Sequence, residues 1–305
     1  MEDHRGRLLH RLRRAAANVA RGAAYVAILL TLILARAAVP LYALVVALGV
    51  AVVALLVLER TRTGFAHFVG YMSGFVLFAL LRNEADDTGI GIKAQYVVDA
   101  ERRLFGGTLP TAWFQDRLHR PGEIGLVAVM CMLVYFSYFV AAHGVALAFW
   151  RRSAAEFKRY ALALLLTVYI GLAACLLVPT APPWLASEYS NAPPMVRVVS
   201  EVLGSNPEQA GHDTAGVNAF AAMPSLHFAL TVLVALALWR GPRRRPAAVL
   251  YVAAMGFTLV YGGEHYVLDL LVGAAVAVAA WLVAGRFVGS LTSSQPVEPS
   301  EQGCS

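Results

Sequence analysis

Two histidine-containing segments of the chain combine the residue types that phosphate chemistry requires. The first, residues 223–227 with the sequence MPSLH, opens an apolar run. Proline is favoured in the first turn of a helix, where its missing N–H group would have no partner in any case. The N–H groups of Ser225 and Leu226 would then lie at the positive end of the helix dipole, which is an anion site. We therefore expect Pro224 and Ser225 to bind a phosphate, with His227 within one turn of it.

The second segment, residues 262–269 with the sequence GGEHYVLD, joins two apolar runs. On a helix, His265 and Asp269 are four residues apart and share one face. A carboxylate bonded to one ring nitrogen fixes the tautomer and leaves the other nitrogen free as a base or nucleophile. Ionisable residues in a membrane segment are costly and usually functional. The sequence therefore predicts that His227, His265 and Asp269 are catalytic and converge in one pocket.

Both segments also have a structural interpretation. The chain has eight histidines, and in such a chain a His-x-x-x-Asp spacing arises by chance roughly one time in five. His227 alone fits a helix-terminal histidine at the lipid interface. The catalytic interpretation is favoured because both segments fall at helix ends on the same predicted side of a membrane.

The composition indicates that these segments are positioned by membrane helices. The chain has 305 residues, of which 59% are hydrophobic and 14% charged, and its mean hydropathy is +0.62. A soluble protein of this size needs a more polar surface. The net charge of +6 does not indicate nucleic-acid binding, because the basic residues stand between apolar runs. We predict an all-α polytopic membrane helix bundle. About eight transmembrane helices are expected, at 22–39, 41–58, 65–81, 124–150, 160–179, 221–239, 246–263 and 267–285.

Basic clusters predict the orientation. With eight crossings and both ends inside, the clusters beside the runs face the cytoplasm, and both histidine segments face the outside of the cell membrane. The outer loop 180–217 has Arg197 as its single basic residue, which fits that side. The expected domains are a basic cytoplasmic N-terminus (1–21), N-terminal transmembrane helices (22–81), an outer loop with an interfacial helix (82–122), a catalytic membrane domain (123–286) and a disordered cytoplasmic tail (287–305).

The two segments together resemble the motifs of the type 2 phosphatidic acid phosphatase superfamily, which carries Pro-Ser-x-His and a later His-x-x-x-Asp. The form found here is similar to the inositol phosphorylceramide synthase-like branch, and residues 178–184, VPTAPPW, resemble that branch's Ala-Pro-Pro motif. The similarity covers about 120–285. It implies a metal-independent enzyme without a cofactor, in which His265 forms a phosphohistidine. Asp269 would orient His265, and His227 would protonate the leaving oxygen.

The phosphate clamp departs from the simple phosphatases of this superfamily. Those phosphatases carry a Lys-x6-Arg-Pro motif. This chain keeps its last two residues, Arg120 and Pro121, but has Trp113 at the lysine position. Their Ser-Arg pair is replaced by Thr258 and Leu259. We expect Arg120, followed by Arg117, to bind the substrate phosphate. The alternative is that both arginines form a solvated or headgroup-facing cluster.

The predicted function is a lipid phosphatase or an inositolphosphotransferase-like lipid phosphotransferase that acts on lipid-linked phosphate. Its partners would be the lipid substrate and membrane lipids, without nucleic acid. Tyr135 and Tyr138 are expected to pack or to lie in the aromatic belt instead of binding substrate. The alternative function is a membrane transporter or lipid-binding scaffold whose histidines relay protons or bind a headgroup. A pocket without an arginine near both histidines would favour that alternative.

Overall fold

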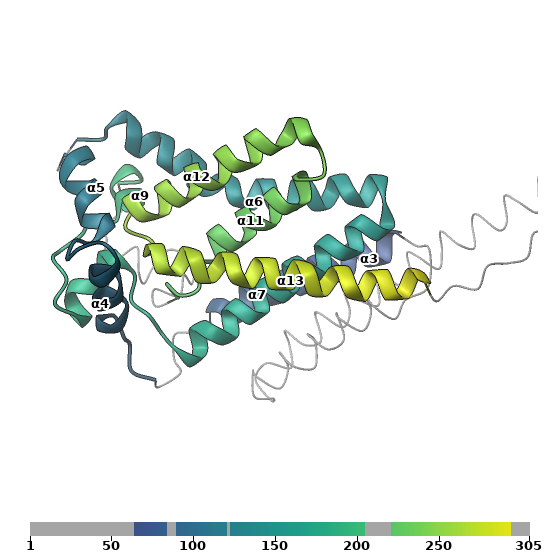
Figure 1. The fold of residues 1–305 in the computed structure, drawn as a ribbon, viewed down its shortest axis with the longest axis horizontal. Helices are drawn as coiled ribbons and strands as arrows, with labels where there is room; N and C mark the ends of the chain where they lie inside the picture. The colour runs from purple at the N-terminus through teal and green to yellow at the C-terminus, as the bar shows by residue number, and fades with distance from the viewer. Residues whose placement is uncertain (1–63, 84–89, 121–122, 205–220, 294–305) are drawn as a thin grey trace, which may run out of the picture.

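The computed structural model describes residues 64–83, 90–120, 123–204 and 221–293, and within these ranges the chain is mostly helical. The expected N-terminus 1–21 and the expected spans 22–39 and 41–58 lie outside them, as do residues 294–305 of the expected tail. Figure 1 shows a bundle of long helices with several short helices gathered at one end.

Six long helices correspond to the six remaining predicted spans: α3 (Gly64–Asn83), α6 (Leu126–Arg152), α7 (Ala154–Leu177), α11 (Leu226–Leu238), α12 (Arg245–Tyr261) and α13 (Val267–Ser293). By length and composition α6, α7 and the stretch Val267–Gly289 of α13 can each cross a membrane. Shorter apolar stretches occur in α3 and α11. The structure therefore supports a helical membrane bundle, and the number of about eight crossings stays a prediction.

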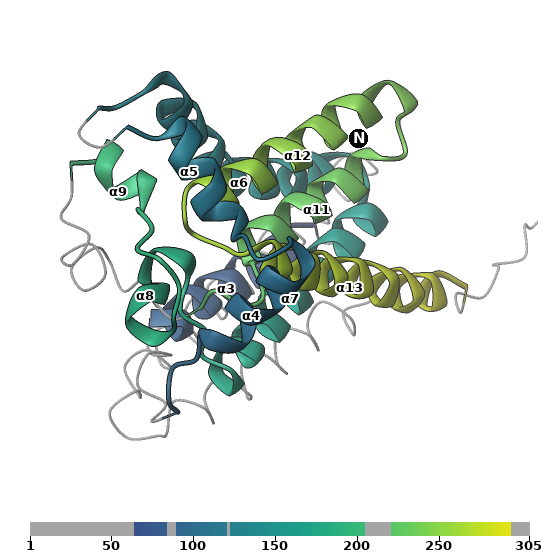
Figure 2. The ribbon, with the colours of Figure 1, turned by 60° about the vertical axis from the view of Figure 1, so that its left-hand side comes forward.

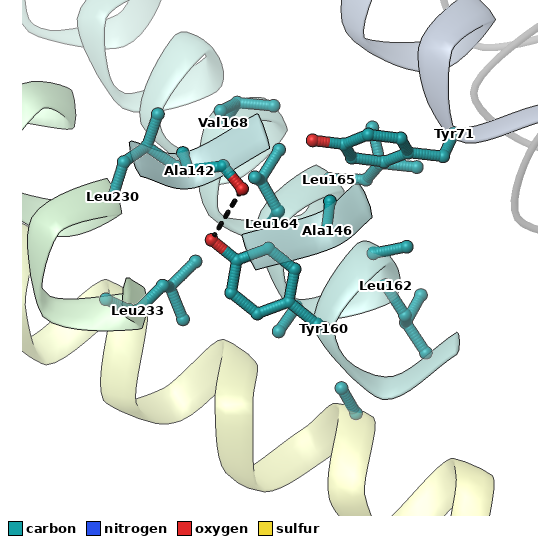
Figure 3. Packing of buried hydrophobic residues seen from close by; sticks show 14 of the residues in the cluster. Tyr71, Ala142, Ala146, Tyr160, Leu162, Leu164, Leu165, Val168, Leu230 and Leu233 are labelled. Atoms are coloured by element: carbon teal, nitrogen blue, oxygen red, sulfur yellow. Dashed lines mark hydrogen bonds between the residues drawn. The ribbon is translucent and has the colours of Figure 1, made fainter. Parts of the chain in front are cut away.

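The centre of the bundle is α7, which packs against α3, α6, α11 and α13. Small and branched side chains are buried along it, and alanines on the neighbouring helices allow close approach. Figure 3 shows this packing: the Tyr160 hydroxyl donates to the carbonyl oxygen of Ala142 at 3.1 Å, so a buried polar atom is paired inside the core. The core therefore fixes α6 and α7 against each other.

Short helices cover one end of the bundle: α4 (Gln95–Leu104), α5 (Pro110–Leu118), η2 (Pro183–Leu185), α8 (Ala186–Tyr189) and α9 (Val198–Val202). Figures 1 and 2 show α4, α5 and α9 at the end where α12 turns into α13. The helix expected on the membrane surface within 82–122 is α4. Its Val97 and Val98 are buried against protein, whereas Leu104 is 61% exposed. These short helices thus form a cap that is part of the folded unit.

Polar contacts tie this cap to the bundle. Gln115 on α5 donates to the carbonyl oxygens of Val196 (2.8 Å) and Tyr261 (2.9 Å), and its own oxygen accepts from the Val196 N–H group. Two isolated parallel bridges join Lys93 to Thr180 and Thr180 to Ala221. These contacts connect the segment before α4 with the segment that leads into α11.

Candidate active site

The start of α11 places His227. Ser225 caps the helix, its hydroxyl oxygen accepting from the Phe228 N–H group at 3.3 Å, and His227 is the second helical residue. Two expectations are wrong here. Pro224 precedes the cap and does not occupy the first turn, and the Ser225 N–H group is not free, because it donates to the Asp269 carbonyl oxygen at 3.1 Å. Neither Pro224 nor Ser225 lines the pocket around His227.

His265 stands in the turn before α13. The expectation that His265 and Asp269 share a helix face is wrong, because α13 begins at Val267. They still meet: Asp269 turns back so that its Oδ2 atom accepts from the Tyr266 N–H group (2.9 Å), and the same oxygen lies 3.5 Å from Nδ1 of His265. The shorter contact of Nδ1 is with the carbonyl oxygen of Ala222, at 2.8 Å.

The Ala222 contact defines the chemistry of the His265 ring. A carbonyl oxygen only accepts, so the hydrogen-bond pattern places the proton on Nδ1. The Nε2 atom then carries a lone pair, and His265 lines the pocket. The arrangement provides an oriented nitrogen nucleophile.

The turn that carries His265 depends on Gly263. Its φ is +75°, and a Cβ atom at this position would lie 2.4 Å from the Val196 carbonyl oxygen. The turn is also held by hydrogen bonds, in which the Trp184 N–H group donates to the Gly263 carbonyl oxygen and the Val198 N–H group to that of Gly262. A side chain at Gly263 would strain the backbone and displace the loop that bears Arg197.

His227 faces His265 across the pocket, with ring centroids 5.7 Å apart. The other sides of the His227 ring contact Tyr138 (4.4 Å between centroids) and Tyr135 (4.7 Å) from α6. Both tyrosines line the same pocket, so they flank the histidine besides packing within the bundle. No feature of the local sequence separates them from the other aromatic residues of that helix.

The pocket has two chemically distinct parts. One part has polar and charged side chains, including both histidines and two arginines. The other is apolar and lies between α3, α7 and α11, where Phe75, Phe78, Val168 and Leu230 line it. A molecule that carries both a phosphate and a hydrocarbon chain matches this division.

Arg197 is the first arginine of the pocket. Its Nε atom lies 2.9 Å from Oε1 of Glu264, and the two side chains are only 11% and 9% exposed. Its guanidinium stands 5.2 Å from the Trp184 ring centroid. Burial lowers the pKa of Arg197, but attraction to Glu264 outweighs it, so the pKa lies above its ordinary value. Arg197 therefore stays cationic at the pocket wall.

Arg82, in the last turn of α3, is the second arginine of the pocket and is half-buried. In the sequence, Arg197 indicated only the orientation of its loop, and Arg82 is the first residue of the expected outer loop 82–122. A usable signal was present for Arg197, because it is the single basic residue among 180–217. Arg82 directly follows an apolar run, as do many arginines that only set the orientation of a membrane helix. Nothing in the local sequence distinguishes it from those arginines.

The arginines expected to bind phosphate lie elsewhere. Arg120 is 83% exposed in its side chain and stands 3.7 Å from Glu123. The Arg117 guanidinium covers the half-exposed Trp113 ring at 4.0 Å and donates to the Trp113 carbonyl oxygen. Neither lines the pocket. Within the described part of the chain, no group of three or more His, Cys, Asp or Glu side chains is arranged to hold a metal ion.

Helices able to cross a membrane line a pocket in which two histidines face each other beside two arginines. This arrangement defines a helical membrane protein with a site suited to an anionic group. Residues 95–283 match the family model described as the PAP2 superfamily, and the chain belongs to this superfamily. The resemblance inferred from the motifs is thereby confirmed. The α3 residues of the pocket lie outside the matched range.

A curated relative is similar to part of the chain. It is a phosphoinositol dihydroceramide synthase of Bacteroides thetaiotaomicron, 27% identical over 154 residues, which cover 44% of this chain and 47% of the relative. The match therefore spans about half the length of that relative. No solved structure matches the chain.

Proposed function

We propose that this protein is an integral membrane lipid phosphatase or lipid phosphotransferase that acts through a phosphohistidine at His265. The observation that carries the proposal is the orientation of the His265 ring, whose Nδ1 atom is bound by the Ala222 carbonyl oxygen. Family membership and the partial similarity to a phosphoinositol dihydroceramide synthase support the same class of reaction. The active site would face the non-cytoplasmic side of the membrane.

In the first step, the Nε2 lone pair of His265 attacks the phosphorus atom of the donor lipid. A P–N bond forms, the P–O bond to the leaving group breaks, and His227 gives its proton to the leaving oxygen. Because the ring centroids lie only 5.7 Å apart, one phosphate in the pocket can contact both side chains. In the second step, water or an alcohol transfers a proton to His227 and attacks phosphorus, and the P–N bond breaks.

Arg197 and Arg82 are the groups we propose to bind the phosphate oxygens, in place of Arg120 and Arg117. Phosphoryl transfer depends on positioning and on neutralising charge on the equatorial oxygens, for which guanidinium groups are suited. Glu264 holds Nε of Arg197, and Tyr135 also hydrogen-bonds this side chain, so the guanidinium is fixed at the pocket wall. Two arginines near both histidines support catalysis over a transporter or scaffold that merely binds a headgroup.

The apolar part of the pocket supports a lipid substrate. Phe78 is buried and Phe75 partly buried, and both project from α3 towards the same pocket as His227. A hydrocarbon chain placed there would leave its phosphate beside the arginines. Because α3 lies outside the residues matched to the family model, we propose that Phe75, Phe78 and Arg82 give the pocket its preference among lipid phosphates.

The test is an assay of purified protein in detergent against phosphatidic acid, a polyprenyl phosphate and phosphatidylinositol, each with and without dihydroceramide as an acceptor. Release of inorganic phosphate would identify a phosphatase. Formation of a phosphoinositol-linked acceptor would identify a phosphotransferase. His265→Ala is the control, and equal product from this variant and the wild type would refute the proposal.

A further inference from the structure

Glu101 on α4 is a fully buried carboxyl group that no catalytic motif contains. It lies one turn beyond Val97 and Val98, on the face by which α4 packs onto the bundle, and all three are 0% exposed. A buried carboxyl group costs free energy unless it is hydrogen-bonded. Its partners therefore show what the side chain does.

The partners of Glu101 are the first N–H groups of α13. Its Oε1 atom accepts from Val267 at 2.5 Å and from Leu268 at 3.3 Å. The first N–H groups of a helix have no partner within the helix, and a carboxylate at this end also interacts favourably with the helix dipole. Glu101 thus caps a helix distant in sequence and fixes where α13 begins.

The capped turn holds the catalytic groups. Asp269 lies one residue beyond Leu268 and accepts from the N–H group of Tyr266. The Asp269 carbonyl oxygen also accepts from the N–H group of Ser225, which caps the helix that carries His227. A shift at the start of α13 would therefore reach both histidines.

We propose that Glu101 is a positioning residue for the proposed phosphoryl transfer, holding the first turn of α13 so that Asp269 and His265 keep their geometry. This inference rests on the proposed function. Glu101 would act through Val267 and Leu268 and would not touch the substrate, since it does not line the pocket. Its loss would therefore lower kcat and leave KM nearly unchanged.

Several titratable groups surround Glu101. Asp269 and Tyr266 lie on the α13 side, and Tyr96 lies on α4 and interacts with both of them. Burial and, more weakly, Asp269 raise the pKa of Glu101 to about 7, against the lowering effect of the two backbone hydrogen bonds. An ionised carboxylate binds N–H groups more strongly than the protonated form. The capping contact consequently strengthens as the pH rises through about 7.

Three variants separate geometry from charge. Glu101→Ala removes the cap, whereas Glu101→Gln keeps an oxygen acceptor and removes the charge. Asp99→Asn is the matched control, because Asp99 lies on the same helix and pairs with Gln95, away from α13. Each is compared with the wild type for kcat, KM and the pH profile. Hydrogen exchange at residues 262–270, followed by mass spectrometry, supplies a readout that does not need turnover.

For Glu101→Ala we expect a loss of kcat of about tenfold to a hundredfold, KM within about twofold of the wild type, and faster exchange at 262–270. In the wild type, kcat should rise as the pH rises through about 7. For Glu101→Gln we expect nearly normal exchange and no such rise in kcat. Asp99→Asn should match the wild type. If Glu101→Ala keeps wild-type kcat, or loses kcat without faster exchange, the inference is overturned. If the wild type turns over no lipid while exchange still rises in Glu101→Ala, the proposed function fails and the hold of Glu101 on α13 stands.

Discussion

Arginines stand at both ends of the helical bundle, but their surroundings differ. At the histidine end, Arg197 is 11% exposed in its side chain and paired with a buried carboxylate. At the opposite end, Arg240 pairs with Glu156 while 62% of its side chain is exposed, and Arg159 covers the Trp281 ring at 4.1 Å. Burying the Arg197 charge costs desolvation free energy and suits a role in ligand binding. Arginines at the opposite end suit the orientation of helices in a membrane. Burial and partners, more than charge, distinguish Arg197 from the arginines at the opposite end.

The largest expected effect separates the nucleophile from its neighbour. His265→Ala should lower turnover by more than about a thousandfold, because it removes the nitrogen proposed to form the P–N bond. Asp269→Asn should lower kcat by between about a hundredfold and ten thousandfold and leave measurable activity, because the Ala222 carbonyl oxygen still holds Nδ1. Initial rates with the best lipid of the panel check both. Equal and mild losses in the two variants would contradict the role of His265.

Arginine variants at the two ends of the bundle test whether the buried arginine binds the phosphate. Arg197→Lys should lower kcat on the order of a hundredfold, because an ammonium group cannot reproduce a bidentate contact with the transferring phosphate. Arg240→Gln is the control at the opposite end and should keep wild-type kcat. Arg120→Lys and Arg120→Ala should also keep it. Rates measured against lipid concentration test this, and a loss confined to Arg120 would return the clamp to the position expected from sequence.

The pH dependence of stability tests the environment of Glu101. Its pKa is raised from 4.5 to about 7, because the cost of burying the charge exceeds the gain from stronger capping bonds. The net contribution of Glu101 to stability is therefore complete below pH 4.5 and is lost as the pH rises through about 7. The loss should be at most about 3 kcal/mol, and Glu101→Gln should lack it. Thermal unfolding in detergent from pH 4.5 to 8 measures the slope. The same slope in both proteins would show that Glu101 is not its source.

The smallest effect concerns the core between the two ends. Tyr160→Phe removes the hydroxyl that donates to the Ala142 carbonyl oxygen and leaves the ring in place. We expect a loss of about 1 kcal/mol in the free energy of unfolding, without a change in KM. Unfolding monitored by intrinsic fluorescence measures it. A change in KM would indicate that the packing of α6 against α7 shapes the pocket.

Much of the membrane bundle could be predicted from local sequence. Apolar runs and the charges between them predicted all six long helices of the described ranges, because the bilayer requires long apolar segments. The placement of Glu101 could not be predicted. Its neighbours Arg102 and Arg103 make the segment look like a solvated helix, whereas its burial depends on α13, which is distant in sequence.

The site was predictable in part for the same reason. His227, His265 and Asp269 are brought together as their motifs predicted, although His265 precedes its helix. The arginines were not found, because Arg82 and Arg197 lie on separate segments that only the tertiary fold brings to the pocket. Motif position favoured Arg120, which the fold leaves at the surface.

The most direct test of the central claim is to trap the covalent intermediate. Purified wild type is mixed with a donor lipid labelled at phosphorus, quenched in alkali within one turnover, and digested for mass spectrometry. If His265 is the nucleophile, we expect an acid-labile, alkali-stable phosphoryl or phosphodiester group on the peptide that contains His265, and no label in His265→Ala. Label on another residue, or turnover by His265→Ala at the wild-type rate, would contradict it.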